Sequence, residues 1–271
     1  MHFTNYEHSG RPGRAWLLVT LLGLPAVALL SLIYSYIVVY IPIGGVLTLF
    51  IMGGYVFGMG FIISWLGHVA KCRSQMTMRL LGAISGIVAL WLAWVFFLYA
   101  LINRNEHGGV KVLDLVLHPD AMWQIACEVA ESGWYTIKKT TPSGAVLWSF
   151  WGIEATVVIG GVILMAPAAI TQEMFCETCD GWCPVKETKF LHIDDKLSKT
   201  KLEHIEILPL FTLPSSDTKV IPSIRTELLE CAACKLSKGI RFIRMTMTTD
   251  KEGKTSENAE NLPGIYIPPA R

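Results

Sequence analysis

The sequence predicts an all-α membrane part, a bundle of four transmembrane helices, followed by a small β-rich domain exposed to water. Two observations lead to this fold class. Hydrophobic residues make up 52% of the 271 residues, above the roughly 45–50% that is usual for soluble domains. Charge is also unevenly distributed, because residues 1–170 hold 9 Lys/Arg and 7 Asp/Glu whereas residues 171–271 hold 14 and 15. Such different compositions predict at least two domains.

The first two spans come from one long run that contains no charged side chain, from Ala15 to Gly67. A bilayer core of about 30 Å takes about 20 helical residues, so this run suits two spans. The proline and glycines of Ile41–Gly45 are expected to end the first of them. The four expected spans are Trp16–Tyr40, Gly44–Leu66, Leu80–Ile102 and Val146–Ile170.

The distribution of basic residues predicts the orientation of the spans. The N-terminal tail carries Arg11 and Arg14, and the connection between spans two and three carries Lys71, Arg73 and Arg79 with no acid. With four spans these two segments lie on the same side, which the positive-inside rule assigns to the cytoplasm. We therefore expect a cytoplasmic tail at 1–15, a transmembrane domain at 16–170 and a cytoplasmic domain at 171–271. A signal peptide cleaved near Ala26–Ala28 is the alternative for the first span.

The long connection at 103–145 is expected outside, with an amphipathic helix within it. Pro119 suits the first helical position, Asp120 the first turn, and Gly133 the position after the end. One helical face gathers Met122, Ile125, Ala126, Val129 and Ala130. This helix is expected either to lie on the outer membrane surface or to cover the span ends.

Glu154 is the one charged residue expected inside a span, eight residues into span four. A charge near mid-bilayer costs on the order of 2.5–3.5 kcal/mol, so a partner, a proton or water must offset it. Candidate hydroxyl partners are Tyr34, Ser35, Tyr36 and Thr48. Three interpretations stay open: a protonated carboxyl between helices, a site that handles protons or cations, and a contact with another subunit.

Glycines four residues apart are expected to mark a helix-packing face. Span two has Gly54 and Gly58, and span three has Gly82 and Gly86. Small residues at this spacing let two helix backbones approach closely. We expect spans two and three to pack through these faces, with a homo-oligomer contact or a pore wall as the alternative.

Two Cys-x-x-Cys pairs predict a metal site in the last hundred residues. The pairs are Cys176 with Cys179 and Cys231 with Cys234. Each spacing points two sulfurs at one point, and four thiolates match tetrahedral Zn²⁺. The reducing cytoplasm keeps such thiols available. Because Cys183 supplies a further thiol, an iron–sulfur cluster and a redox dithiol are alternatives, as are cysteines without metal.

The sequence around these pairs resembles zinc-ribbon domains in a general way. A strand is expected at Ile240–Thr248 and an inserted strand pair at Leu202–Leu213. The 51 residues between the pairs exceed the about 15–20 of compact ribbons. The polar stretch Asp250–Asn261 is expected to be flexible, and Leu262–Pro269 to dock as an edge strand.

These features favour a non-enzymatic integral membrane protein, an anchor, adaptor or complex subunit that acts through its structural-zinc domain. Lys and Arg (23) nearly balance Asp and Glu (22), so nucleic acid is not an expected partner. A phosphate-binding glycine loop, Gly-x-Ser-x-Gly and His-Glu-x-x-His are all absent from the sequence. One alternative is a small channel or transporter that uses Glu154, with the zinc domain as regulator. A membrane enzyme of unknown type is the other.

The expected surroundings follow from this architecture. The spans require a lipid bilayer, and a protein partner or a second copy of the chain is expected at the cytoplasmic domain. We expect an integral protein of a plasma membrane, specifically a bacterial inner membrane, with the C-terminal domain in the cytoplasm.

Overall fold

The chain divides into two compact units. The computed structural model describes residues 4–41, 46–105, 110–133, 141–194, 207–210, 213–249 and 254–267. Gly10–Thr171 form the helical unit, and Gln172–Arg271 together with Met1–Ser9 form the second unit. The start of the chain therefore belongs to the same unit as the cysteine pairs.

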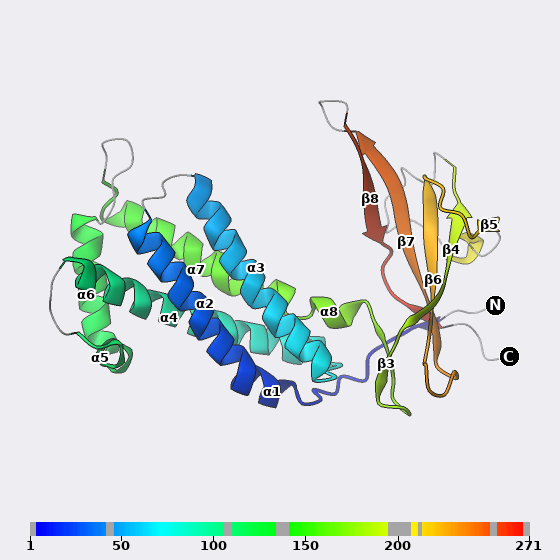
Figure 1. Cartoon of the computed structure of the whole chain (residues 1–271), viewed down its shortest axis with the longest axis horizontal. Coiled ribbons are helices and arrows are strands. Elements are labelled where there is room, and N and C mark those ends of the chain that lie inside the picture. Colours follow the sequence, from blue (N-terminus) through cyan, green and yellow to red (C-terminus); the bar gives the residue numbers. More distant parts are fainter. Residues whose placement is uncertain are drawn as a thin grey trace. The chain divides into compact units, whose positions relative to one another are not determined.

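Among the described residues, four helical stretches are long and apolar enough to cross a membrane (Figure 1). They are Ala15–Tyr40, Leu47–Val69, Gln75–Arg104 and Ala145–Thr171. The four predicted stretches are thus confirmed as long apolar helices, with boundaries that differ by up to five residues. The third begins at Gln75 rather than Leu80 because polar and basic residues extend its first turns.

Several helical elements make up these stretches. The first consists of α1 (Ala15–Leu18), the π-helical turn η1 (Val19–Gly23) and α2 (Leu24–Tyr40). The second is α3 (Val46–Val69) and the third is α4 (Gln75–Asn105). The fourth is α7 (Ala145–Met165), followed after Pro167 by α8 (Ala168–Thr171). Pro167 explains the break, because proline cannot donate the backbone bond that a helix interior needs.

The helices pack around a shared apolar interior, in which α2 and α7 each contact both α3 and α4. At one end, the backbone nitrogen of Arg14 donates to the carbonyl of Ala70 (3.0 Å), and that of Arg73 donates to the carbonyl of Arg11 (2.8 Å). The N-terminal tail and the α3–α4 connection, the two basic segments of the sequence, therefore lie side by side.

The glycine pairs do not pack as expected. A Cβ placed at Gly82 would lie 2.9 Å from the Cβ of Ala166, and one at Gly86 would lie 3.0 Å from the Cα of Ile159. The span-three glycines thus meet α7 instead of α3. A Cβ at Gly58 would lie 3.5 Å from a methyl group of Leu30 in α2, and one at Gly54 has no described atom within 4 Å. The spacing identified close approach correctly for span three but assigned the wrong neighbour.

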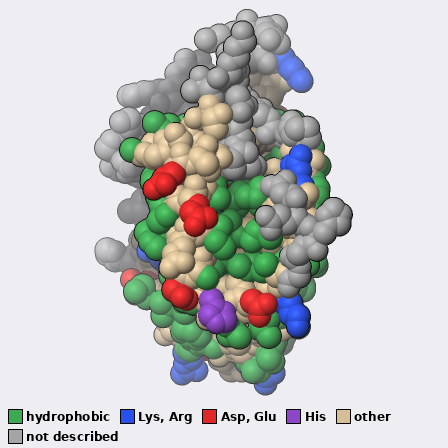
Figure 2. Space-filling model, turned by 90° about the vertical axis from the view of Figure 1, so that its left-hand side faces the viewer, with side chains coloured by type: hydrophobic (Ala, Val, Ile, Leu, Met, Phe, Trp, Pro, Cys, Tyr) green, Lys and Arg blue, Asp and Glu red, His purple; other side chains and the backbone are tan. Residues whose placement is uncertain are grey.

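Two short helices cover one end of the spans. They are α5 (Val112–Leu117) and α6 (Pro119–Ser132), and α6 confirms the predicted helix, with Gly133 at φ +72° after its end. Leu115 and Met122 pack against Val95 and Leu98 of α4. Figure 2 shows hydrophobic side chains gathered on this face among acidic ones. Exposed apolar side chains of these helices are Leu113, Leu117 and Trp123.

The second unit is built on an antiparallel sheet with the order β1-β9-β7-β6-β4-β5, and β8 also pairs with β7 (Figure 1). Its strands are β1 (Thr4–Asn5), β4 (Val185–His192), β5 (Ser215–Ser216), β6 (Ser223–Glu230), β7 (Lys238–Thr249), β8 (Thr255–Asn261) and β9 (Tyr266–Ile267). A separate hairpin pairs β2 (Met174–Cys176) with β3 (Gly181–Cys183).

The strand predictions for this unit were partly right. Strand β7 confirms the one expected at Ile240–Thr248. The expected strand pair at Leu202–Leu213 is wrong where the structure describes it, because Ile207–Leu210 form the helical turn α10; residues 202–206 and 211–212 lie outside the described residues. Part of the stretch expected to be flexible forms β8, which pairs with β7 along its length. Strand β9 lies between β1 and β7 rather than at an edge.

The sheet has a compact apolar core and a buried ion-pair group. Ile224 of β6 and Phe242 of β7 are fully buried in this core. Glu227 of β6 is buried as well and forms ion pairs with Arg225 and Arg241. Arg241 also donates to the carbonyl oxygen of Gln172, the first residue of the unit after the fourth span. The segment that enters this unit is therefore hydrogen-bonded to the middle of the sheet.

Candidate metal centre

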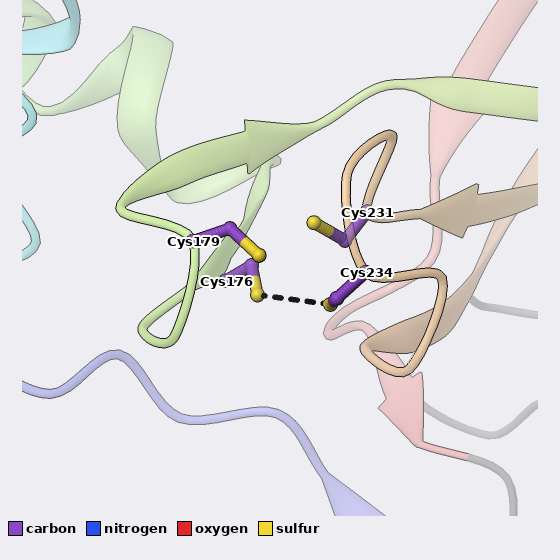
Figure 3. Close-up of side chains that lie close together, drawn as sticks. All are labelled: Cys176, Cys179, Cys231 and Cys234. Atoms are coloured by element: carbon purple, nitrogen blue, oxygen red, sulfur yellow. Dashed lines mark hydrogen bonds between the residues drawn. The ribbon is translucent and has the colours of Figure 1, made fainter.

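The four predicted cysteines lie on two tight turns. The first turn joins β2 to β3, with Cys176 at the end of β2 and Cys179 within the turn. The second joins β6 to β7 and carries Cys231 and Cys234. Figure 3 shows the two turns facing each other with the four sulfurs between them.

The two turns share a local backbone conformation. The residue after the second cysteine has a positive φ in both, +50° at Asp180 and +58° at Lys235. Non-glycine residues adopt this left-handed conformation uncommonly, and aspartate more readily than most. In the second turn the backbone nitrogen of Lys235 donates to the carbonyl of Cys231, and that of Cys231 donates to the carbonyl of Ser237, both at 3.0 Å. These bonds fix the turn locally.

The turns bring the four sulfurs to one point. All four Sγ atoms lie within 4.8 Å of one another, and the Sγ atoms of Cys176 and Cys234 are 3.7 Å apart (Figure 3). The two pairs, separated by 51 residues in the sequence, thus form one group. This group could hold a metal ion.

Hydrogen bonds to the sulfurs favour thiolates at two positions. The Ser237 hydroxyl lies 3.2 Å from the sulfur of Cys176, and its hydrogen bond lowers the pKa of that thiol. Backbone hydrogen bonds from Leu236 and Ser237 lower the pKa of Cys234 to about 6. By contrast, the hydrogen bonds that Cys179 makes with Cys234 and Cys231 raise its pKa to about 12. Negative charge and protons are therefore shared within the group, as expected of sulfurs that a cation would draw together.

The group lies in an apolar environment. Cys176 is fully buried and Cys231 is 3% exposed, and Met174, Leu229 and Ile265 pack around them. Burial of this kind keeps water away from the sulfurs. It also makes uncompensated thiolates costly, since buried charge needs a partner or a metal.

Cys183 lies beside this group without belonging to it. Its side chain is 3% exposed in the same apolar cluster, and it is not among the four sulfurs that converge. Burial, followed by the neighbouring cysteines, raises the pKa of Cys183 to about 12. Cys183 is therefore a neutral thiol rather than a reactive one.

Two contributors near the group were missed by sequence reasoning. Tyr6 packs against the cysteine cluster from the far end of the chain, and no local pattern connects it to residue 175. Ser237 could have been found, because a hydroxyl residue three positions after the last cysteine is well placed to bond a ligand sulfur.

Glu154 lies in α7, in the other unit. Of its candidate partners, Tyr34 of α2 donates to the Oε1 atom at 2.6 Å. Ser35 instead donates to the carbonyl oxygens of Ser31 and Ala93, and Tyr36 stacks on Tyr40. The predicted hydroxyl partner for the carboxyl is therefore Tyr34.

Comparison with known proteins adds no relative to this picture. No protein-family model, no curated protein and no solved structure matches the chain. The functional argument therefore rests on the four-cysteine group and on the polar contacts among the helices.

Proposed function

We propose that the chain is a non-enzymatic membrane adaptor or complex subunit. Its four helices anchor it in the bilayer, and a structural zinc ion stiffens a cytoplasmic domain that binds a protein partner. The observation that carries the proposal is the convergence of the four cysteine sulfurs within 4.8 Å.

The spacing of the sulfurs supports zinc. A tetrahedral Zn²⁺ site with Zn–S bonds of about 2.3 Å separates its sulfurs by about 3.8 Å. The Cys176 and Cys234 sulfurs, at 3.7 Å, already have this separation. Four thiolates fill the coordination of zinc and leave no position for water or substrate. The ion would then hold the two turns together rather than perform chemistry.

The surface beside the site supports a role in binding. Leu236 follows the second cysteine pair and is 83% exposed, the most exposed of the large hydrophobic side chains described. Its neighbours Lys235 and Lys238 add positive charge to the same turn. A metal-fixed turn of this kind presents an aliphatic side chain at little entropic cost, which suits a partner with an apolar pocket and acidic groups around it.

The test uses the full chain, cross-linked in its membrane, solubilised in mild detergent and captured by an affinity tag. Metal content and co-purifying protein are measured on the same sample. We expect one zinc per chain and a stoichiometric partner. Leu236→Asp should keep the zinc and lose the partner. The control Met247→Asp should keep both, because Met247 is 53% exposed but lies near the other end of β7.

Three outcomes would overturn parts of this proposal. A chain that carries one zinc but no stoichiometric partner removes the adaptor role. Equal partner retention by both variants removes Leu236 from the binding surface. One iron in place of zinc replaces the proposed ion, since tetrahedral sulfur sites accept either metal.

A further inference from the structure

A chain of polar side chains crosses the interior of the helical unit. The Tyr34 hydroxyl of α2 donates to Oε1 of Glu154 in α7 at 2.6 Å. The Tyr34 ring stacks on that of Tyr55 in α3, with centroids 4.5 Å apart and an interplanar angle of 5°. The Tyr55 hydroxyl in turn lies 2.7 Å from Oγ of Ser31 in α2. Contacts in series therefore run from α7 through α2 to α3.

The chain ends on the backbone of α4. Both the Ser31 and Tyr55 hydroxyls lie within hydrogen-bond distance of the Ala89 carbonyl oxygen, at 3.2 and 3.1 Å. One turn further, Ser35 donates to the carbonyl oxygen of Ala93 at 2.8 Å. Ser31 and Ser35 are almost fully buried, and the two tyrosines are less than a tenth exposed. All four spans therefore contribute to one buried polar network that terminates at Glu154.

The carboxyl has no basic group to pair with inside the membrane. Glu154 is the tenth residue of α7, roughly 14 Å along the helix, near the middle of a core about 30 Å thick. The uncharged parts of the other three spans supply no Lys or Arg. A carboxylate at this depth is costly unless a cation or a proton neutralises it.

The titratable groups around Glu154 are all neutral or acidic. Tyr34 faces it from α2, and Tyr55 follows from α3. At the end of α4, Arg104 is directed elsewhere, since it donates to the carbonyl oxygen of Val39 at 2.6 Å. Helix α6, which packs on α7, carries the acids Asp120, Glu128 and Glu131.

We propose that Glu154 is an intramembrane proton-binding site, with Tyr34 as its positioning residue. The carboxylate takes a proton from water to become a neutral carboxylic acid, and the reverse step returns that proton to water. A metal cation fits less well, because Ca²⁺ and Mg²⁺ take six or more oxygen ligands and Tyr34 is the one described hydrogen-bond partner of this carboxyl. The half-buried side chain leaves the carboxyl accessible for exchange. This site is independent of the zinc-based role.

Labelling with dicyclohexylcarbodiimide, an apolar reagent for protonated carboxyl groups, tests the proposal. The full chain in phosphatidylcholine liposomes is labelled over a range of pH, and the modified peptide is found by mass spectrometry. We expect Glu154 to be labelled at neutral pH and the labelling to fall at alkaline pH. Glu154→Gln should abolish this label. The exposed acid Glu131 should stay unlabelled at neutral pH, because its carboxyl is ionised in water.

A pair of tyrosine variants tests the positioning role. Removing the Tyr34 hydroxyl withdraws a hydrogen bond from the carboxylate, so in Tyr34→Phe the pH of half-labelling should rise by about one unit, a tenfold change in proton affinity. Tyr36→Phe, on the same helix but stacked on Tyr40, should leave it unchanged.

The wild-type profile decides the proposal even if Tyr34→Phe fails to fold. Absence of label on Glu154 at every pH overturns the proton site. Labelling that sodium chloride blocks at constant pH overturns it in favour of a sodium site. Equal midpoints in the two tyrosine variants remove the role of Tyr34.

Discussion

The Tyr6 hydroxyl lies 3.1 Å from the backbone nitrogen of Phe175 and 3.3 Å from its carbonyl oxygen. Phe175 directly precedes Cys176, the first of the converging cysteines. Just before Tyr6, strand β1 pairs with β9, and the Tyr6 nitrogen donates to the Ile265 carbonyl at 2.7 Å. The beginning of the chain thus holds the strand that supplies a sulfur to the site.

Tyr6→Phe should loosen this strand while keeping the ring in the apolar cluster. The lost hydrogen bond is expected to cost about 1 kcal/mol of stability in the C-terminal unit. Bound metal should then pass to a competing chelator faster than in the wild type, which an absorbance-based chelator assay on the full chain measures. Glu7→Gln, at the next and exposed residue, is the control. Equal release rates for Tyr6→Phe and the wild type would show that the N-terminal segment does not support the site.

The example of Tyr6 shows which features a sequence reveals. The spans were predictable because each depends on an uninterrupted run of apolar residues, and the cysteine group because each pair is fixed by its own short turn. Strand β8, with the sequence Thr-Ser-Glu-Asn-Ala-Glu-Asn, has neither β-branched enrichment nor apolar alternation, and its backbone pairing with β7 forms it. Strand β1 likewise depends on a partner more than 250 residues away. The α7 neighbour of Gly82 depends on helix arrangement, which spacing on one helix does not contain.

Metal retention should fall as the pH falls. The lowered pKa of Cys234, about 6, means that its thiolate persists at neutral pH and is protonated below that value. Protons then compete with the metal for sulfur. In the metal-free protein, the same thiolate stabilises the fold above the ordinary thiol pKa near 9, and this contribution is lost as the pH falls toward 6. Dialysis from about pH 8 to about pH 5, followed by metal analysis, should show the loss.

Two variants make the pH experiment specific. Ser237→Ala removes the hydroxyl that bonds the Cys176 sulfur, so metal should be lost at a higher pH than in the wild type. Cys183→Ser should leave the metal content at neutral pH unchanged, because Cys183 lies outside the converging group. Loss of metal in Cys183→Ser would instead make this thiol a ligand and contradict the four-cysteine assignment.

Gly82→Ala and Gly54→Ala should have opposite effects on the helical unit. A methyl group at Gly82 would clash with Ala166 and lie 3.0 Å from the Val162 carbonyl oxygen, so α4 and α7 must separate, at a cost of about 1–3 kcal/mol. At Gly54 the added methyl meets no described atom, and helix propensity alone favours alanine by about 1 kcal/mol. Thermal unfolding in detergent compares the two. Loss of an oligomer in Gly54→Ala would show that a second copy of the chain uses this face.

The membrane topology follows from contacts within each unit. Pairing of β1 with β9 requires the N-terminal segment and the C-terminal unit to share one side of the membrane, and the Arg73–Arg11 backbone bond adds the α3–α4 connection to that side. With four spans, α6 must then face the opposite side. In a Cys127→Ser background, Glu131→Cys should react with an impermeant maleimide on intact cells, and Glu7→Cys only after permeabilisation. The reverse pattern would place the cysteine group outside, where an oxidising environment favours disulfides over a metal site.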